Sequence, residues 1–188
     1  MVAIGGCAGP RRLSLHSLTF LSGTLVALCS SPNIRRLQHL ELDDSVAWGM
    51  RIKSVGPPDA GEYQSAFSPL EHLQSLTLES VRGIHALLPH LHRAPTLRLL
   101  SIRCKPNSSD IEAATSPLPS FDVLSSLLVA APQLEVRLLM PATLERWLAL
   151  GHSIPVGRAV IEQQWRELQR MAAEMERVSV AGWQPPSA

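Results

Sequence analysis

The histidines between residues 85 and 92 have a type and spacing that could bind a metal ion. Two imidazole nitrogens brought together at the end of a helix are a common part of zinc sites. Pro89, however, interrupts the segment that holds His85, His90 and His92, and no cysteine or carboxylate lies close by in the sequence. Because leucines mark the buried side of the same segment, we expect surface histidines and predict no metal site.

The acidic residues Glu41, Asp43 and Asp44 form a second candidate group. Carboxylate oxygens are typical ligands of calcium and magnesium, and they also attract basic peptides. These residues alternate with leucines or directly follow them, as polar residues do at the end of a half-buried strand. The pattern favours solvent-facing strand residues over a cation site.

No catalytic motif accompanies these groups. The chain has no GxGxxG or GxxxxGK loop for phosphates, no HExxH pair for zinc and no GxSxG nucleophile turn. We therefore predict no catalytic residues and no cofactor, and a protein that is not an enzyme. A hydrolase assembled from scattered histidines and aspartates is the weakest of the alternatives.

Length and composition describe the scaffold that must position any functional residue. A chain of 188 residues has the size of one domain and can bury a sizeable core. Aromatic residues make up only 4% of the chain and there are 30 leucines, so the core must be aliphatic. The formal net charge of +1 argues against a nucleic-acid partner, because binding along phosphates requires an excess of Lys and Arg.

The cysteines and one uncharged stretch indicate the compartment. Cys7, Cys29 and Cys104 are odd in number and form no CxxC pair, which favours a reducing compartment, the cytoplasm or the nucleus. Residues 13–34 carry no Asp, Glu, Lys or Arg, as in a membrane anchor. Serines, threonines and a histidine interrupt this stretch, and its apolar residues are periodic, so we predict no membrane segment.

An internal repeat is the clearest signal in the chain. Residues 31–42 and 68–78 both begin with Ser-Pro and end in the pattern LxxLxL, and residues 94–102 end in LxxLxI. Less complete copies occupy residues 11–15, 131–138 and 178–180. Residues two apart point to the same side of a strand, so each copy predicts a strand with one apolar side.

The strands must pack against one another and against helices. A single unit cannot bury its own apolar side, so we expect neighbouring units to stack around the inward pairs Leu40/Leu42, Leu76/Leu78 and Leu100/Ile102. Apolar residues with helical spacing follow most strands: Leu21, Leu25 and Leu28; Ile84, Leu87, Leu88 and Leu91; Val123, Leu124, Leu127 and Leu128; Leu144 and Leu148.

An amphipathic helix is predicted from about residue 158 onward, before a last strand that ends at about residue 181. Its apolar side holds Ile161, Trp165, Leu168, Ala172 and Met175, and its charged side holds Glu162, Arg166, Arg170 and Glu174. We expect the charges to face solvent. We also expect the helix to cap the open end of the stack, as terminal units of repeat proteins must.

The repeats resemble those of leucine-rich repeat proteins, and more narrowly the irregular repeats that follow the F-box in many fungal F-box proteins. The resemblance covers about residues 10–180. Such repeats usually place Asn or Cys after the motif, whereas this chain has Ser45, Val81 and Lys105 there. The resemblance implies a curved parallel sheet with helices on its convex side and recognition of a target protein by the repeats, without the F-box that docks to a ubiquitin ligase.

Outward strand positions are the candidate binding residues, because they line the concave face of such a sheet. We expect all of them to point to solvent and their charge to run from acidic to basic along the stack. The candidates are His39, Glu41, Asp43, Ser75, Thr77, Glu79, Ser101, Arg103, Glu135 and Arg137. Two insertions, residues 45–67 and 105–120, leave the same edge of the sheet and are predicted to add a rim to this surface.

Together these features predict an α/β leucine-rich repeat solenoid of about five strands in a single domain. Repeats occupy about residues 10–157, the capping helix and last strand about 158–181, and a tail 182–188. We expect a monomeric, non-catalytic scaffold for a protein partner. The resemblance implies the target-recognition part of an F-box-like ubiquitin-ligase receptor. The alternative is a truncated or decayed fragment of a larger repeat protein with no activity of its own.

Overall fold

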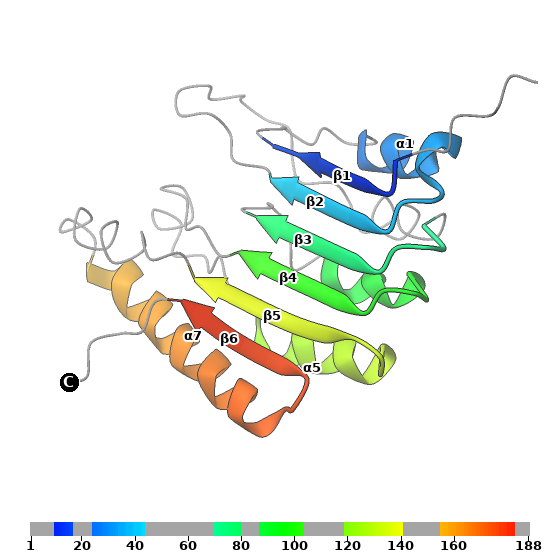
Figure 1. The fold of residues 1–188 in the computed structure, drawn as a ribbon. Helices are drawn as coiled ribbons and strands as arrows, with labels where there is room; N and C mark the ends of the chain where they lie inside the picture. Colours follow the sequence, from blue (N-terminus) through cyan, green and yellow to red (C-terminus); the bar gives the residue numbers. More distant parts are fainter. Residues whose placement is uncertain are drawn as a thin grey trace, which may run out of the picture.

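One parallel sheet organises the chain, seen in a computed structural model that describes residues 10–16, 24–43, 70–79, 87–103, 119–140 and 155–182. Its six strands follow one another in sequence order (Figure 1). They are β1 (Arg12–Leu15), β2 (His39–Asp43), β3 (Ser75–Glu79), β4 (Leu99–Arg103), β5 (Glu135–Met140) and β6 (Val178–Gly182). The α/β class is confirmed, and the expected count of about five strands is corrected to six, because the incomplete first and last copies both join the sheet.

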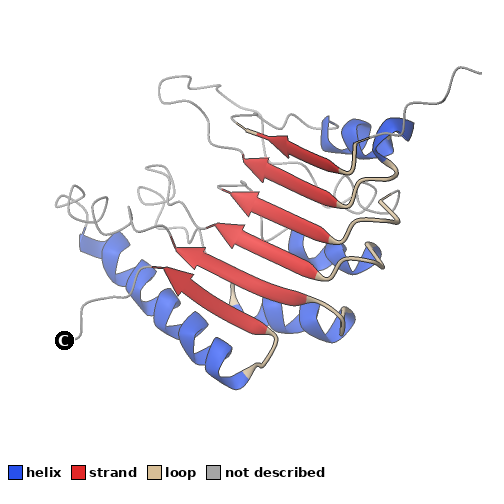
Figure 2. Cartoon of the chain, in the orientation of Figure 1, coloured by secondary structure: helices blue, strands red, loops and turns tan. Residues whose placement is uncertain are grey.

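The described helices lie along one face of this sheet and leave the other face open (Figure 2). They are the α-helices α1 (Thr24–Ser30), α5 (Phe121–Ala130) and α7 (Pro155–Glu174), and the short 3₁₀ helices η1 (Pro32–Ile34) and η2 (Leu88–Arg93). Ser120 caps the start of α5, where its side chain accepts a hydrogen bond from the Val123 N–H at 3.4 Å.

The core consists of apolar rows that run across the strands beneath the helices. Leu40, Leu76, Leu100 and Val136 form one row in register, and Leu42, Leu78, Ile102 and Leu138 form the next. All eight side chains are buried, which confirms the predicted inward pairs. Burying a leucine side chain contributes about 1.5–3 kcal/mol, so these rows are a main source of stability.

A bend precedes β2, β3 and β4 and turns one more leucine into the core. Leu37, Leu73 and Leu97 lie three residues before the first inward leucine of their strands and are buried. Each donates its backbone N–H to the carbonyl three residues earlier, at 2.9 to 3.2 Å. The LxxLxL spacing is therefore a bend leucine followed by two strand leucines.

Hydrogen bonds from threonine, glutamine and arginine side chains join consecutive bends. Thr96 donates its hydroxyl to the Glu71 and Leu73 carbonyls, and Gln133 donates to the Pro95 carbonyl. Arg177 lies in the bend before β6 and donates to one carbonyl in the last turn of α5 and to three carbonyls after it. These donors satisfy backbone carbonyls in the bend before the preceding strand.

The helices expected between the strands are confirmed only in part. Residues 121–130 form an α-helix in which Leu124, Leu127 and Leu128 are buried. The segment around Leu88 and Leu91 is instead the 3₁₀ helix η2, with Pro89 in its first turn, and both leucines are buried. The expected helix at Leu144 and Leu148 lies outside the described residues.

The C-terminal helix α7 begins at Pro155 and precedes the last strand. Trp165 and Leu168 are buried as predicted, and Met171, which the predicted apolar side omits, is buried as well. On the opposite side Arg170 Nε lies 3.9 Å from Glu174 Oε1, and both side chains are exposed. The helix contacts β6 and α5, so it connects β5 to β6 across the helical face. Its role as a cap stays a prediction.

Candidate binding face

All ten candidate binding residues lie on four neighbouring strands, β2 to β5. Strand register aligns them in rows: His39 with Ser75 and, beyond Leu99, Glu135; Glu41 with Thr77, Ser101 and Arg137; Asp43 with Glu79 and Arg103. We call the side of the sheet that carries these rows the open face. The alternation along each strand is what separates the open face from the core.

Asp43 and Glu79 differ from the prediction that every candidate points to solvent. Each is only 7% exposed. Both end their strands beside a partner: His16 Nδ1 lies 3.7 Å from Asp43 Oδ2, and Arg103 Nη1 lies 3.1 Å from Glu79 Oε2. Buried carboxylates require such partners because an unpaired charge out of water is strongly unfavourable. The two residues are therefore parts of the structure rather than freely accessible contact groups.

Arg103 connects three strands across the open face. Besides Glu79 on β3, its Nη1 donates to Glu41 Oε1 on β2 at 2.8 Å. Ser14 on β1 donates to the other oxygen of Glu41 at 3.1 Å. The hydrogen bond with Glu79 is the largest reason that the pKa of Arg103 is raised, followed among the favourable causes by the charge of Glu41. Burial opposes this shift.

This network changes the predicted charge gradient. Arg103 pairs with both Glu41 and Glu79, although one guanidinium offsets only one of the two carboxylate charges. On β5, Glu135 and Arg137 are exposed, and no ion pair joins either of them to another described residue. The exposed charges of β5 are therefore available to a partner, alongside the negative charge that remains on β2 and β3.

Two further contacts belong to the open face. His39 Nδ1 lies 2.7 Å from Ser75 Oγ, a hydrogen bond between neighbouring strands. Ser14 and His16, which sequence reasoning left out of the binding face, extend it to β1 through their contacts with Glu41 and Asp43. The signal that could have found Ser14 is its place between Leu13 and Leu15 in the truncated first copy.

The candidate metal-binding groups have other contacts. His92 Nδ1 lies 2.6 Å from the Pro89 carbonyl, so this ring is tied to its own backbone. Burial is the first cause of the lowered pKa of His90, followed by the charges of Arg93 and His92. His85 and Asp44 lie outside the described residues. Within the described ranges, no three His, Cys, Asp or Glu side chains form a group that could hold a metal ion.

Both predicted insertions, residues 45–67 and 105–120, fall almost entirely outside the described residues. In the described part of the chain no helix is long and apolar enough to cross a membrane. Comparison with protein-family models, curated proteins and solved structures found no match for this chain.

Proposed function

We propose that the chain is a leucine-rich repeat solenoid whose open face binds a partner protein in the cytoplasm or nucleus, without catalysis. The observation that carries the proposal is a sheet face that no described helix covers, with polar side chains in register from neighbouring strands (Figure 2). By resemblance, the function is that of the target-recognition part of an F-box-like ubiquitin-ligase receptor.

The arrangement of charges supports a protein ligand. Side chains held on strands and cross-linked by Arg103 are ordered before binding, so little conformational entropy is lost on association. Glu135 and Arg137 place one exposed charge of each sign at neighbouring outward positions of β5. Mixed charges of this kind orient a protein partner and speed its encounter.

The test is a comparison of two charge reversals in affinity purification from extracts of the source cells. Arg137→Glu alters the open face, whereas Arg36→Glu makes the same change at an exposed position in the bend before β2. We expect both variants to melt like the parent, because both side chains are exposed. A partner that binds the open face associates several-fold more slowly with Arg137→Glu and normally with Arg36→Glu.

Each outcome distinguishes the possible functions. A partner held equally well by the parent and by both variants would place binding elsewhere on the molecule. Failure of the parent to hold any reproducible partner would favour the fragment alternative, in which the chain has no activity of its own.

A further inference from the structure

Arginines gather at the edge of the sheet where the strands begin. Because β1 to β4 are parallel and in register, the segments that precede them lie side by side along this edge (Figure 2). The described residues of these segments, 10–11, 30–38, 70–74 and 88–98, contain a single carboxylate, that of Glu71. They contain five arginines, which we call the basic edge: Arg11, Arg35, Arg36, Arg93 and Arg98.

The arginines of the basic edge are accessible, since all five are exposed. Among the described residues, no carboxylate forms an ion pair with four of them: Arg11, Arg35, Arg36 and Arg98. The positive charge also acts on a neighbouring imidazole. Burial is the first cause of the lowered pKa of His90, and the charges of Arg93 and His92 lower it further.

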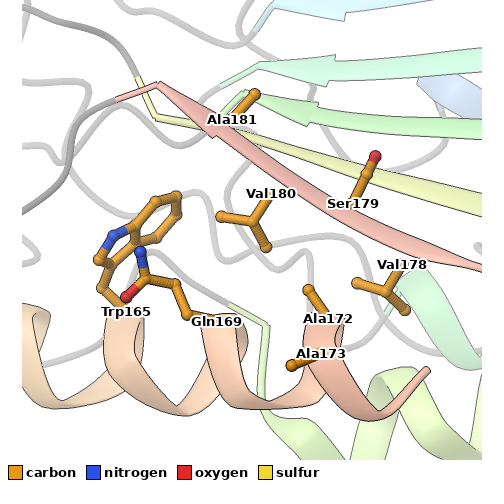
Figure 3. A pocket seen from close by; sticks show the side chains of 8 residues that line it. All are labelled: Trp165, Gln169, Ala172, Ala173, Val178, Ser179, Val180 and Ala181. Atoms are coloured by element: carbon orange, nitrogen blue, oxygen red, sulfur yellow. The ribbon is translucent and has the colours of Figure 1, made fainter. Parts of the chain in front are cut away.

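The excess of positive charge is local to this edge. The formal net charge of the whole chain is only +1, so the remainder of the chain carries a net negative charge. Before β5, residues 131–134 are uncharged, and before β6 the charge of Arg177 is offset by Glu176. The hollow between α7 and β6 is also lined by uncharged residues, including Trp165 and Val180 (Figure 3). The basic edge is therefore where an anionic group is attracted.

Backbone hydrogen bonds hold the basic edge in place. The Arg11 carbonyl accepts from the N–H groups of Gln38 and His39 at 2.8 and 3.0 Å, and the Arg98 N–H donates to the Gln74 carbonyl at 2.9 Å. Neighbouring strands lie about 4.8 Å apart, so the starts of β1 to β4 span about 14 Å. An extended chain advances about 3.3 Å per residue, so about five residues cross the edge.

We propose that the basic edge binds an acidic segment of a partner protein, rich in Asp and Glu. The segment crosses the starts of the strands, and its carboxylates accept hydrogen bonds from the arginine side chains. Guanidinium groups suit this role because each presents two parallel donors to one carboxylate. The surface is separate from the open face, so this inference goes beyond the proposed function.

A nucleic acid fits the basic edge less well. The described residues of the four segments include no aromatic side chain, so unpaired bases have nothing to stack on. A long polyanion would also meet the net negative remainder of the chain, whereas a short acidic segment meets the edge alone. The Glu71 carboxylate lies within the edge and opposes any anion there.

Fluorescence anisotropy with the full chain tests the proposal, using a labelled peptide of about ten alternating Glu and Ser residues, long enough to cross the edge. We expect binding that weakens as NaCl rises from about 0.05 to about 0.5 M, because salt screens exposed charges. A matching peptide of Gln and Ser should not bind.

Two double variants compare the basic edge with arginines elsewhere. Arg35→Gln with Arg98→Gln should raise the dissociation constant of the acidic peptide roughly five- to tenfold. Arg166→Gln with Arg170→Gln makes the same change in net charge at exposed positions of α7 and should leave binding unaltered. Both proteins should melt like the parent, because all four side chains are exposed.

Glu71→Gln provides a test in the opposite direction, because it removes the one carboxylate of these segments. We expect it to strengthen binding of the acidic peptide about twofold. The pull-down separates the two surfaces as well. A partner of the basic edge is lost from Arg36→Glu and kept by Arg137→Glu, the reverse of a partner of the open face.

Several results would overturn the proposal. They are equal or absent binding of the Glu and Gln peptides, and an equal loss of affinity in the two double variants. A DNA oligonucleotide of equal charge that binds Arg35 and Arg98 more tightly than the peptide would assign the edge to nucleic acid. A parent that is a dimer, separated by Arg35→Gln with Arg98→Gln, would assign it to a second copy of the chain.

Discussion

At the scale of single residues, Arg103 and Glu79 illustrate how a polar side chain becomes structural. Glu79 ends β3 nearly out of contact with water, and Arg103 on β4 donates to it at 3.1 Å. The Arg103 side chain itself remains 46% exposed. An ion pair with one buried member is worth more than a fully exposed pair, because less solvent screens the buried charge.

A double-mutant cycle measures this difference. Glu79→Gln and Arg103→Met, alone and together, are expected to show a coupling free energy of about 1–2 kcal/mol in urea unfolding. The matched cycle of Glu41→Gln with Arg103→Met should give roughly 0.2–1 kcal/mol, because Glu41 is more exposed at 26%. Equal couplings for the two pairs would show that the burial of Glu79 has no energetic effect.

At the scale of elements, the bends decide how one strand follows another. Arg177 lies between α7 and β6 and donates to the Leu128, Ala131, Pro132 and Leu134 carbonyls, at 2.7 to 3.5 Å. Carbonyls at the end of a helix have no partner within the helix, so α5 depends on such donors. One arginine thereby joins the end of α5 to the start of β6.

We expect Arg177→Met to lower the free energy of unfolding by about 1.5–3 kcal/mol, the usual value for hydrogen bonds to a charged group. The thioether side chain keeps much of the packing but donates no hydrogen bond. Arg170→Met is the control, because that arginine is exposed on α7 and its pair with Glu174 is worth about 0.3–0.5 kcal/mol. Urea unfolding measures both variants. Similar losses of unfolding free energy in the two would contradict a role for Arg177 in stabilising the end of α5.

At the scale of the whole molecule, one apolar cluster joins all six strands to the helices. It contains Cys29 near the end of α1 as well as Trp165 on α7 and the strand rows between them. Burial raises the pKa of the Cys29 thiol from 9.0 to about 12. The protonation of this thiol therefore depends on whether the core near β1 stays folded.

This shift predicts how stability depends on pH. The pKa of the Cys29 thiol is higher in the folded chain than in the unfolded chain. The contribution of the buried thiol to stability is therefore fully present below pH 9 and is lost as pH rises toward 12. We expect the free energy of unfolding to fall more steeply over this window in the parent than in Cys29→Ala. Urea unfolding at intervals from pH 8 to 11 measures this difference in slope. The titration of Lys and Tyr side chains affects both proteins alike. Parallel curves would mean that the thiol is accessible in the folded state.

The sequence by itself determined the strands and the side of each strand that is buried. Leu40 and Leu42, like Leu76 and Leu78, are two residues apart, and the direction of a side chain along a strand is a local property. The same reasoning placed the candidate residues on one face and Trp165 on the buried side of its helix. The leucine spacing did not reveal that the segment around Leu88 and Leu91 would form the 3₁₀ helix η2 rather than an α-helix.

Only the tertiary structure decided which outward residues remain accessible. Glu79 and Asp43 are buried beside Arg103 and His16, which are distant in the sequence, and Arg103 reaches Glu41 across 62 positions of the chain. Such contacts depend on register and on the lengths of the connections, which a pattern within one strand does not contain. The burial of Trp165 likewise requires α7 to pack against β6 and α5, which the pattern within one helix does not contain.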